Sequence, residues 1–403
     1  MPSAQPLPPT PTRLPRADRI QNFRPSVFTE TRELAERHGA IDLGQGAPGL
    51  SAPRALLDDA MAAIAEGHNQ YPPAAGLPEL RRAIADSRLR RSGIRYDADR
   101  EVVVTAGATE AVTAALLALC NPGDEVLTLD PCYDAYEAAA SLAGARLVAV
   151  PLATEGDRFC LDEAALRAAV TPRTRLLLLN SPHNPTGKAF TAAELAAVAR
   201  VCLDHELTAV TDEVYEHLVY DGAGHHSLAS VPDMRERTLV VSSAGKTFNV
   251  TGWKVGWACG PDRLVGAVLS VKQFLTFASG TPFQLAVARM LGDEEEAWTA
   301  ELRSTLQRHR DLLRTGLEQA GLRTYRCEGG YFLQADVRGV GYLDGARFCR
   351  DLPARAGVAA IPCSAFRHGP QNPHTDRLVR FSFCKPADVV REATSRLTGK
   401  WRA

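Results

Sequence analysis

The sequence predicts an α/β fold: a large domain, in which a mostly parallel sheet lies between helices, and a smaller α+β domain after it. Two observations lead to this prediction. Between residues 101 and 245, short runs rich in β-branched residues and leucine alternate with alanine-rich helical stretches, a pattern typical of βαβ units. Beyond residue 321, shorter strands and helices replace that pattern. With 403 residues, the chain is long enough for two domains.

The N-terminus precedes both domains. Residues 1–16 contain six prolines and no apolar core. This composition is typical of a disordered or extended tail, which we place at residues 1–18. It does not fit a signal peptide, which needs a continuous apolar segment.

Five apolar runs predict the strands of the large sheet. They are EVVVTAG (101–107), EVLTLD (125–130), RLLLLN (175–180), LTAVTDE (207–213) and TLVVSSAG (238–245). The stretches ATEAVTAALLALC (108–120) and AYEAAASLAGA (135–145) predict helices between them. Because ligands of such sheets bind at the carboxyl ends of the strands, polar residues at those ends are the candidate site.

The second half of the chain begins with a charged segment, residues 293–320, that predicts a long helix ending at Gly321. The segments GGYFLQADV, GVAAIPCSAF and LVRFSFC follow and predict the short elements of the smaller domain.

Composition and charge argue against several classes of function. A formal charge of −1 gives no reason to expect nucleic acid or an anionic membrane as partner. We expect the arginine-dense segment 80–95 to be a solvated helix face. No apolar run reaches the length of a membrane span. Nine scattered cysteines without a C-x-x-C pair argue against a disulfide framework and a zinc site, and fit a cytoplasmic protein.

Three strand ends carry residues suited to a charged ligand. TAGATEA (105–111) turns a strand into a helix, where backbone N–H groups and the helix dipole favour a phosphate. NSPHNPTG (180–187) offers the Asn184 amide from a loop that two X-Pro steps keep from becoming helical. Asp212 ends an apolar strand, where a carboxylate is costly unless it meets a cation; a helix N-cap is an equally good interpretation.

The fourth strand end contains Lys246, in SSAGKTFNVTGWKVGW (242–257). The chain has six lysines and forty arginines, so a lysine here is an unusual choice. Lysine, unlike arginine, can lose its proton and attack a carbonyl. A phosphate site, a carboxylate and a lysine nucleophile at neighbouring strand ends match pyridoxal 5′-phosphate, which needs a Schiff-base lysine and a carboxylate at its pyridine nitrogen.

Seven motifs in order resemble those of class I aminotransferases of PLP fold type I. They are NQYPPAAGLPELR, GATEA, PCYDAYE, NSPHNPTGK, TDEVYEHL, SSAGKTFNVTGWKVGW and VRFSFCK. The chain is most similar to the kynurenine/glutamine transaminase K and actinobacterial N-succinyldiaminopimelate aminotransferase branches, from about residue 20 to 395. The resemblance implies an N-terminal segment joining the small domain (19–49), a large cofactor-binding domain (50–290), and a connecting helix with the small domain (291–403).

The resemblance also implies a ping-pong reaction through aldimine and pyridoxamine forms of the cofactor. Lys246 would hold the cofactor and move a proton between the substrate α-carbon and C4′. Asp212 would pair with the pyridinium nitrogen, and Asn184 and Tyr215 would bond the phenolic oxygen of the ring. Tyr133 would stack on its face.

Further roles follow from the same resemblance. The residues implied to hold the phosphate are Ser243, Lys254, Gly107, Ala108 and Thr109. Tyr71 would reach the phosphate of the other subunit, which implies a homodimer with shared active sites. Arg380 would clamp the substrate α-carboxylate in a bidentate manner, assisted by the backbone near Gly46. Substrate binding would then draw the small domain closed.

Two positions depart from the family pattern. Ala47 and Cys132 stand where aromatic residues are common, and both are expected near the substrate entrance; a wider pocket and compensated drift are equally good interpretations. The substrate, whether of the kynurenine/glutamine type or N-succinyldiaminopimelate, therefore stays open. Two alternatives have the same residues: a cysteine-conjugate β-lyase, and a regulator that binds the cofactor without catalysis. The second is disfavoured because no DNA-binding domain precedes residue 20 and no catalytic group is missing.

Overall fold

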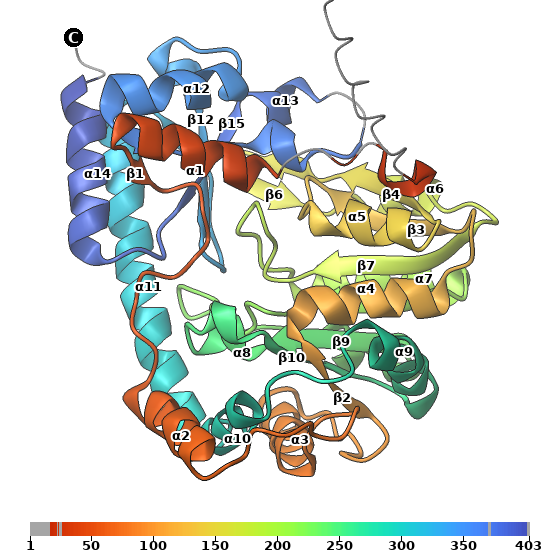
Figure 1. Cartoon of the computed structure of the whole chain (residues 1–403). Coiled ribbons are helices and arrows are strands. Elements are labelled where there is room, and N and C mark those ends of the chain that lie inside the picture. The colour runs from red at the N-terminus through yellow and green to blue at the C-terminus, as the bar shows by residue number, and fades with distance from the viewer. Residues whose placement is uncertain (1–16, 22, 24–25, 370–371, 401–403) are drawn as a thin grey trace, which may run out of the picture.

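The computed structural model describes residues 17–21, 23, 26–369 and 372–400. All but the last two residues of the predicted tail, 1–18, lie outside this range. Figure 1 shows a sheet between helices in the lower right part of the molecule. The first helix and the C-terminal elements form the upper left part, and the long helix α11 (Asp293–Gln319) runs between the two.

The large sheet has seven strands and is mostly parallel, as predicted. Their order across the sheet is β2 (Val102–Ala106), β10 (Val255–Cys259), β9 (Thr238–Ser243), β8 (Thr208–Asp212), β7 (Thr174–Asn180), β3 (Glu125–Asp130) and β4 (Arg146–Pro151). Only β10, among these described strands, is antiparallel to its neighbours. The five predicted strands are confirmed, except that Gly107 begins α4 (Gly107–Leu119) and residues 244–245 begin a short helix, α8 (Ala244–Thr247).

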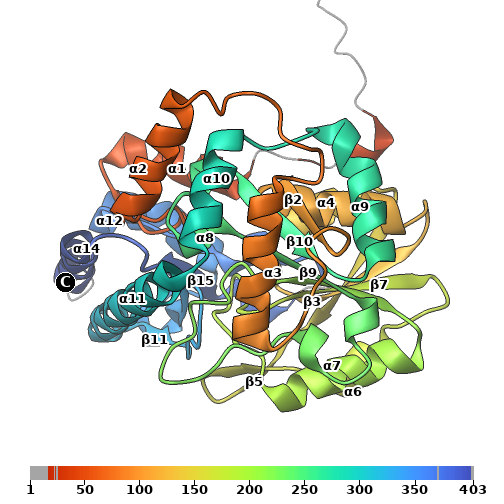
Figure 2. The ribbon, with the colours of Figure 1, turned by 90° about the horizontal axis from the view of Figure 1, so that it is seen from below.

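Helices cover both faces of this sheet, and the strand side chains alternate between them. Leu176 and Leu178 pack toward α4 (Gly107–Leu119), α5 (Ala135–Leu142) and α9 (Asp262–Leu275). Leu177 and Leu179 face the opposite layer, which contains α6 (Glu163–Ala168) and α7 (Ala192–Asp204). Figure 2 shows α3 (Pro78–Ser92) and α10 (Thr281–Met290) side by side on this second face, with α2 (Arg54–Ala65) beyond α10.

Helix α3 corrects one prediction. The arginine-dense segment 80–95 forms this helix, but its face is not fully solvated, because Arg81 and Arg88 are buried. Arg88 reaches buried carboxylates beneath the sheet, a contact that no pattern along the helix announces.

The C-terminal elements form a smaller, antiparallel sheet. Its strand order is β11 (Arg323–Thr324), β12 (Phe332–Asp336), β15 (Leu378–Ser382) and β14 (Ile361–Pro362). Helices α12 (Gly345–Ala356), α13 (Pro373–Asp376) and α14 (Ala387–Lys400) accompany it. Helix α11 ends as predicted before Gly321, whose φ is +93°.

The N-terminal segment lies against this smaller sheet. Helix α1 (Val27–His38) packs on α12, and β1 (Ile41–Asp42) pairs with β13 (Val358–Ala359) in parallel. The remaining elements are the hairpin of β5 (Ala153–Glu155) and β6 (Arg158–Cys160) and short 3-10 helices at Asp18–Ile20, Leu228–Ser230, Arg235–Arg237, Thr251–Trp253, Val337–Val340 and Cys363–Phe366. Within the described ranges, no helix is both long enough and apolar enough to cross a membrane.

Candidate active site

A cavity of about 350 Å³ opens where the carboxyl ends of β7, β8 and β9 meet the start of α4 and the N-terminal segment. This size is ordinary for a small-molecule site. Every predicted site residue except Tyr71 lines it: Gly46, Gly107, Ala108, Thr109, Tyr133, Asn184, Asp212, Tyr215, Ser243, Lys246, Lys254 and Arg380. The parallel strands therefore bring together side chains that are far apart in the sequence.

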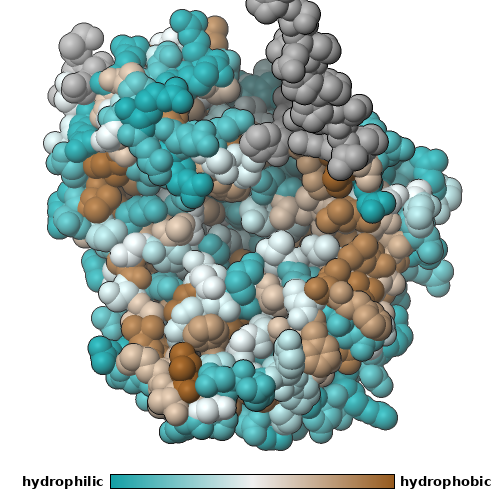
Figure 3. All heavy atoms as spheres, viewed as in Figure 1, coloured by the Kyte–Doolittle hydropathy of each residue, from teal (hydrophilic) through white to brown (hydrophobic). Residues whose placement is uncertain are grey.

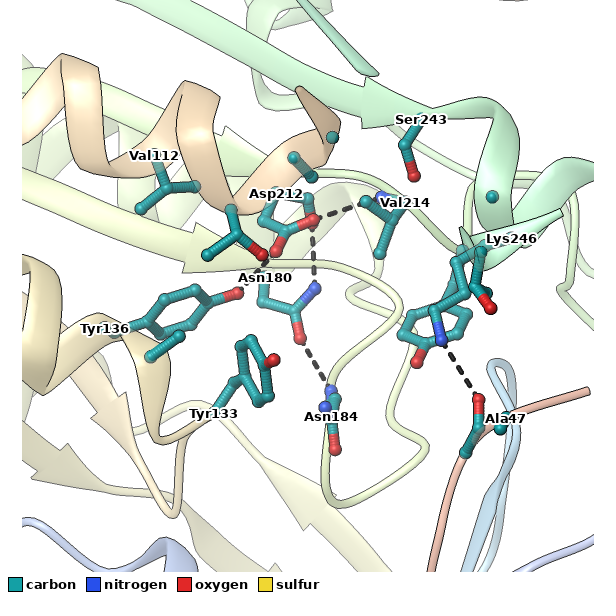
Figure 4. A pocket seen from close by; sticks show the side chains of 18 of the residues that line it. Ala47, Val112, Tyr133, Tyr136, Asn180, Asn184, Asp212, Val214, Ser243 and Lys246 are labelled. Carbon is teal, nitrogen blue, oxygen red and sulfur yellow. Dashed lines mark hydrogen bonds between the residues drawn. The ribbon is translucent and has the colours of Figure 1, made fainter. Parts of the chain in front are cut away.

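Lys246 presents its amine to this cavity from the first turn after β9. Its Nζ donates a hydrogen bond to the carbonyl oxygen of Gly46 at 3.1 Å (Figure 4). The rings of Tyr215 and Tyr331 lie with their centroids 5.7 Å and 5.3 Å from Nζ. No described carboxylate forms an ion pair with it, and burial lowers the pKa of Lys246 to about 8. A fraction of the amine is therefore neutral and nucleophilic near neutral pH.

Asp212 is a buried carboxylate at the end of β8. Its Oδ2 accepts from the Tyr136 hydroxyl at 2.7 Å, and its Oδ1 accepts from the Val214 N–H at 3.2 Å (Figure 4). Burial raises its pKa, although these hydrogen bonds act in the opposite direction. No described lysine, arginine or histidine lies within ion-pair distance of it, so a cationic N–H group of a ligand would complete its environment.

Asn180 holds the Asn184 loop beside Asp212. Its Nδ2 donates to the backbone carbonyl of Asp212 at 2.8 Å, and its Oδ1 accepts from the Asn184 N–H at 2.6 Å. Sequence reasoning assigned no role to Asn180 or Tyr136. Tyr136 lies in the first turn of α5, and Tyr133 lies two residues before that helix in the same PCYDAYE motif. Their rings meet edge to face, with centroids 5.7 Å apart.

The start of α4 forms a cradle for an anion. Gly107 has φ +77°, and a Cβ on Gly256 of the neighbouring strand β10 would lie 2.5 Å from the Gly107 carbonyl carbon and 2.7 Å from the Ala108 nitrogen. Lys254 lies over the same turn, because a Cβ on Gly107 would be 3.2 Å from its Nζ. An ammonium and a helix N-terminus at one end of the cavity favour a phosphate there. Ser243 and Thr109 line that end of the cavity.

Arg380 is completely buried on β15, at the other end of the cavity. Its Nη1 donates to Asn184 Oδ1 and its Nη2 to the Gly44 carbonyl, both at 2.8 Å. The Phe332 ring lies 3.8 Å from its guanidinium carbon. Burial lowers its pKa to about 10, and its Nε has no hydrogen-bond partner among the described residues. A buried guanidinium without a described carboxylate partner favours binding of an anionic ligand.

Two of the predicted positions, Tyr71 and Cys132, do not line the cavity. Tyr71 is outside the cavity, and 86% of its surface is exposed. Ala47 lines the cavity, as expected. Cys132 does not: it is buried against the apolar layer of α4 and α5, so its expected position at the substrate entrance is wrong. Tyr133, its neighbour in sequence, also packs against this layer but is only partly buried and lines the cavity.

Comparisons with known proteins agree with this geometry. Residues 39–397 match the family model Aminotransferase class I and II. The chain is 50% identical to Probable N-succinyldiaminopimelate aminotransferase DapC of Mycobacterium tuberculosis, with 94% of this chain and 97% of that protein covered. It is 35% identical to Kynurenine–oxoglutarate transaminase 1 of Homo sapiens, with 96% and 98% covered. The solved structure of N-succinyldiaminopimelate aminotransferase from Mycobacterium tuberculosis matches with a TM-score of 0.93 and 50% identity, covering 96% of this chain and 100% of that one.

Proposed function

Because the chain belongs to the class I and II aminotransferase family, we propose that its cavity binds pyridoxal 5′-phosphate and transfers the amino group of an L-amino acid to a 2-oxo acid. One observation carries this proposal. The amine of Lys246, the buried carboxylate of Asp212 and the guanidinium of Arg380, which has no carboxylate partner among the described residues, all line one cavity. The three groups match the aldehyde and pyridine nitrogen of the cofactor and the carboxylate of an amino acid.

The residues present fit the cofactor at both of its ends. The cradle of Gly107, Ala108 and Thr109, with Ser243 and Lys254, would hold its phosphate, because these residues line the cavity at the N-terminus of α4. The buried Asp212 would hold the pyridine N–H, and that cation would stabilise a carboxylate whose pKa burial otherwise raises. When bound, the cofactor supplies an electron sink for negative charge at the substrate α-carbon.

Three side chains would orient the ring between these ends. Tyr133 would stack on its face, and Asn184 and Tyr215 would donate to its phenolic oxygen. Asn184 is pre-positioned for this, since Asn180 holds its backbone and Arg380 bonds its side-chain oxygen, which leaves the amide N–H groups to donate. Tyr136 would act on Asp212, through the hydroxyl that donates to it.

Lys246 would attack the cofactor aldehyde and later move a proton between the substrate α-carbon and C4′. Both tasks need a neutral amine, which the lowered pKa of about 8 makes available. Its present hydrogen bond to the Gly46 carbonyl ties it to the segment that we propose borders the substrate.

Arg380 would clamp the α-carboxylate of the substrate. The planar guanidinium, held on one side by Asn184 and Gly44 and covered by Phe332, suits the planar carboxylate. The backbone near Gly46 would assist from the N-terminal segment. Because Arg380 and Gly46 lie outside residues 50–290, which we propose as the large domain, substrate binding would draw the residue 19–49 and 291–403 segments closer to it.

We also propose that the enzyme is a cytoplasmic homodimer with shared active sites. Tyr71 would reach the cofactor phosphate of the other subunit, and its exposure outside its own cavity supports this. Large apolar side chains that a partner would cover are exposed near it in sequence or space, among them Phe274, Leu275 and Phe277. Figure 3 shows a hydrophobic area over α4 and α5, beside the hollow in the middle of that face. Nine free cysteines fit a reducing compartment.

For the donor we propose an amino acid of the kynurenine/glutamine type or N-succinyldiaminopimelate, in keeping with the relatives. The described cations that line the cavity, Lys246, Lys254 and Arg380, all have proposed roles. The distal carboxylates of N-succinyldiaminopimelate would therefore need a cation from outside this set, such as one of the partner subunit.

The test is the visible absorption of the purified protein with cofactor, before and after each member of a donor panel. The panel contains glutamate, glutamine, methionine, kynurenine, aromatic amino acids, cysteine conjugates and N-succinyldiaminopimelate. A donor that bleaches the band, with a 2-oxo acid restoring it, would identify the substrate. A band that persists while ammonia and pyruvate accumulate would instead favour the β-lyase, and a protein without any band would overturn the cofactor assignment.

A further inference from the structure

Lys272 is a buried lysine that the reaction described above does not use. It lies near the end of α9, is 0% exposed, and donates from Nζ to the backbone carbonyls of Ala74 and Phe277, each at 2.5 Å. No described carboxylate forms an ion pair with it; burial lowers its pKa, and the charge of Glu110 opposes this. Burying an amine is costly, so its value here lies in joining two carbonyls, which an apolar side chain cannot do.

The Ala74 carbonyl belongs to the segment that contains Tyr71, and the Phe277 carbonyl belongs to the residue that packs against Tyr71. The Tyr71 ring meets the Phe277 ring edge to face, with centroids 5.6 Å apart. The Thr281 hydroxyl donates to the Gln70 carbonyl at 2.5 Å. We call residues 70–75 the Tyr71 arm; it contacts residues 277–281 directly at Gln70 and Tyr71, and Ala74 is joined to Phe277 through Lys272.

One of the two residues that Lys272 joins, Phe277, has a strained backbone conformation. Phe277 adopts φ +63°, the left-handed region that a bulky side chain rarely occupies. The bond from Lys272 to the Phe277 carbonyl helps to hold this conformation, and with it the ring against which Tyr71 packs. Both bonds come from the single Nζ of Lys272, whereas an arginine would need two different nitrogens of a larger, planar group to make them.

A second chain of contacts leads from the arm to the phosphate cradle of the same subunit. Glu110 accepts from the Thr276 hydroxyl at 2.6 Å and from the Ala106 N–H at 2.5 Å, and the Val104 N–H donates to the Ala75 carbonyl at 2.9 Å. Lys272 therefore has two candidate tasks: to support the cradle of its own subunit, or to set the arm that serves the partner.

We propose that Lys272 is a positioning residue that acts on the partner's active site, by holding Tyr71 where it reaches the phosphate of the cofactor bound there. The proposal rests on the shared active site proposed above. It favours the second task because the two bonds from Lys272 Nζ end on the arm and on the segment that packs against Tyr71, whereas both routes to the cradle are indirect, one through Thr276 and Glu110 and one through Ala75 and Val104.

Two heterodimers, whose chains carry different affinity tags, test whether Lys272 affects cofactor binding in its own subunit or in the partner subunit. In each, only the chain that retains Lys246 gives the visible band of lysine-bound cofactor, so a cofactor titration reports on one site. The trans heterodimer combines a Lys246→Ala, Lys272→Met chain with a wild-type chain; the live site then receives the altered arm. The cis heterodimer combines a Lys246→Ala chain with a Lys272→Met chain; the live site then receives an intact arm.

Relative to a wild-type and Lys246→Ala heterodimer, we expect about tenfold weaker cofactor binding in the trans heterodimer and an unchanged value in the cis heterodimer. The reverse result, or equal binding in both, would overturn the proposal. Since both heterodimers contain the same substitutions, a general loss of stability affects them alike. If Lys272→Met prevents assembly, Lys272→Gln, which can still reach one carbonyl, replaces it with the same expected difference.

A third heterodimer, a Lys246→Ala, Tyr71→Phe chain with a wild-type chain, separates the two proposals. Weaker binding here with no trans effect of Lys272→Met would reject the role of Lys272 and keep the shared site. Unchanged binding here would reject the role of Tyr71 in the shared site, and with it the path through which Lys272 is proposed to act.

Discussion

Two buried arginines, Arg88 and Arg380, have opposite surroundings. Arg88, 3% exposed beneath the sheet, forms ion pairs with Glu216 at 2.5 Å and Glu213 at 3.0 Å. Arg380 is 0% exposed at the cavity and bonds only neutral oxygens among the described residues. Burial lowers the pKa of both, but the carboxylates return that of Arg88 to a value above the ordinary one, whereas that of Arg380 falls to about 10.

The difference separates a structural charge from a ligand-binding one. Burial alone would raise the pKa of Glu216, yet Arg88, with smaller contributions from other nearby groups, lowers it to about 2, so the pair stays ionised and compensated. The cation at Arg380 remains uncompensated by described residues, and Lys246 shares this condition. A protein retains an uncompensated buried charge where function needs it. A buried charge that has an ionic partner therefore indicates a role in stability, and a buried charge without one indicates the ligand-binding site.

The largest expected effect is that of Lys246→Ala, which removes one of the uncompensated cations. We expect turnover to fall by about 10⁴-fold or more, because the nucleophile and the proton carrier are lost together. The fold and dimer should persist, since the substitution also relieves a desolvated amine. Steady-state turnover would check the loss of activity, and molar mass from light scattering would check that the dimer persists. Activity close to that of the unaltered protein would reject the assignment.

Arg88→Met should cost stability rather than substrate binding. Removing one partner of a buried ion pair destabilises by about 3–5 kcal/mol, because Glu213 and Glu216 are left uncompensated. The check is urea unfolding, with the KM for the donor expected to stay within about twofold. Adding Glu213→Gln and Glu216→Gln to Arg88→Met should recover part of the loss. If Arg88→Met alone left the free energy of unfolding unchanged, Arg88 would not have the stabilising role that distinguishes it from Arg380.

Arg380→Ala should have the reverse profile. Loss of a charge-assisted, bidentate contact is expected to raise the KM for any α-amino acid by an amount equivalent to about 2–5 kcal/mol, with little change in unfolding. Arg380→Lys keeps the charge but not the planar fork, so it should recover only part of the affinity. An unchanged KM in the alanine variant would place the carboxylate clamp elsewhere.

The sequence predicted one side of this comparison and missed the other. The order of the motifs identified Arg380, and the apolar runs with polar ends predicted the parallel sheet and the cavity at its carboxyl edge. Arg88 was expected to be solvated, because an arginine-rich helix reads as exposed. Its buried partners are more than a hundred residues away along the chain, and local periodicity carries no information about them.

The same limit explains the other missed residues. Phe332 covers Arg380 because β12 and β15 pair with Gln334 opposite Arg380, a register that neither strand shows on its own. The motif places Cys132 beside Tyr133, but it does not show that Cys132 is buried among the side chains of α4 and α5 while Tyr133 lines the cavity. Sequence motifs identify the residues that carry the chemistry. The residues that hold them in place are determined by packing between segments far apart in the sequence.

The smallest expected effect concerns pH and links both arginines to Lys246. Below its pKa of about 8, Lys246 is an ammonium without a lone pair, so capture of the cofactor by the apoenzyme should accelerate about tenfold per pH unit and level off above pH 8. Stopped-flow absorption between pH 6 and 10 would give the midpoint. Arg380 is one of the charges that lower this pKa, so Arg380→Ala should move the midpoint upward, and Arg88→Met should leave it in place. A midpoint near the ordinary lysine value in the unaltered protein would show that the amine is not desolvated, and would remove the basis for grouping Lys246 with Arg380.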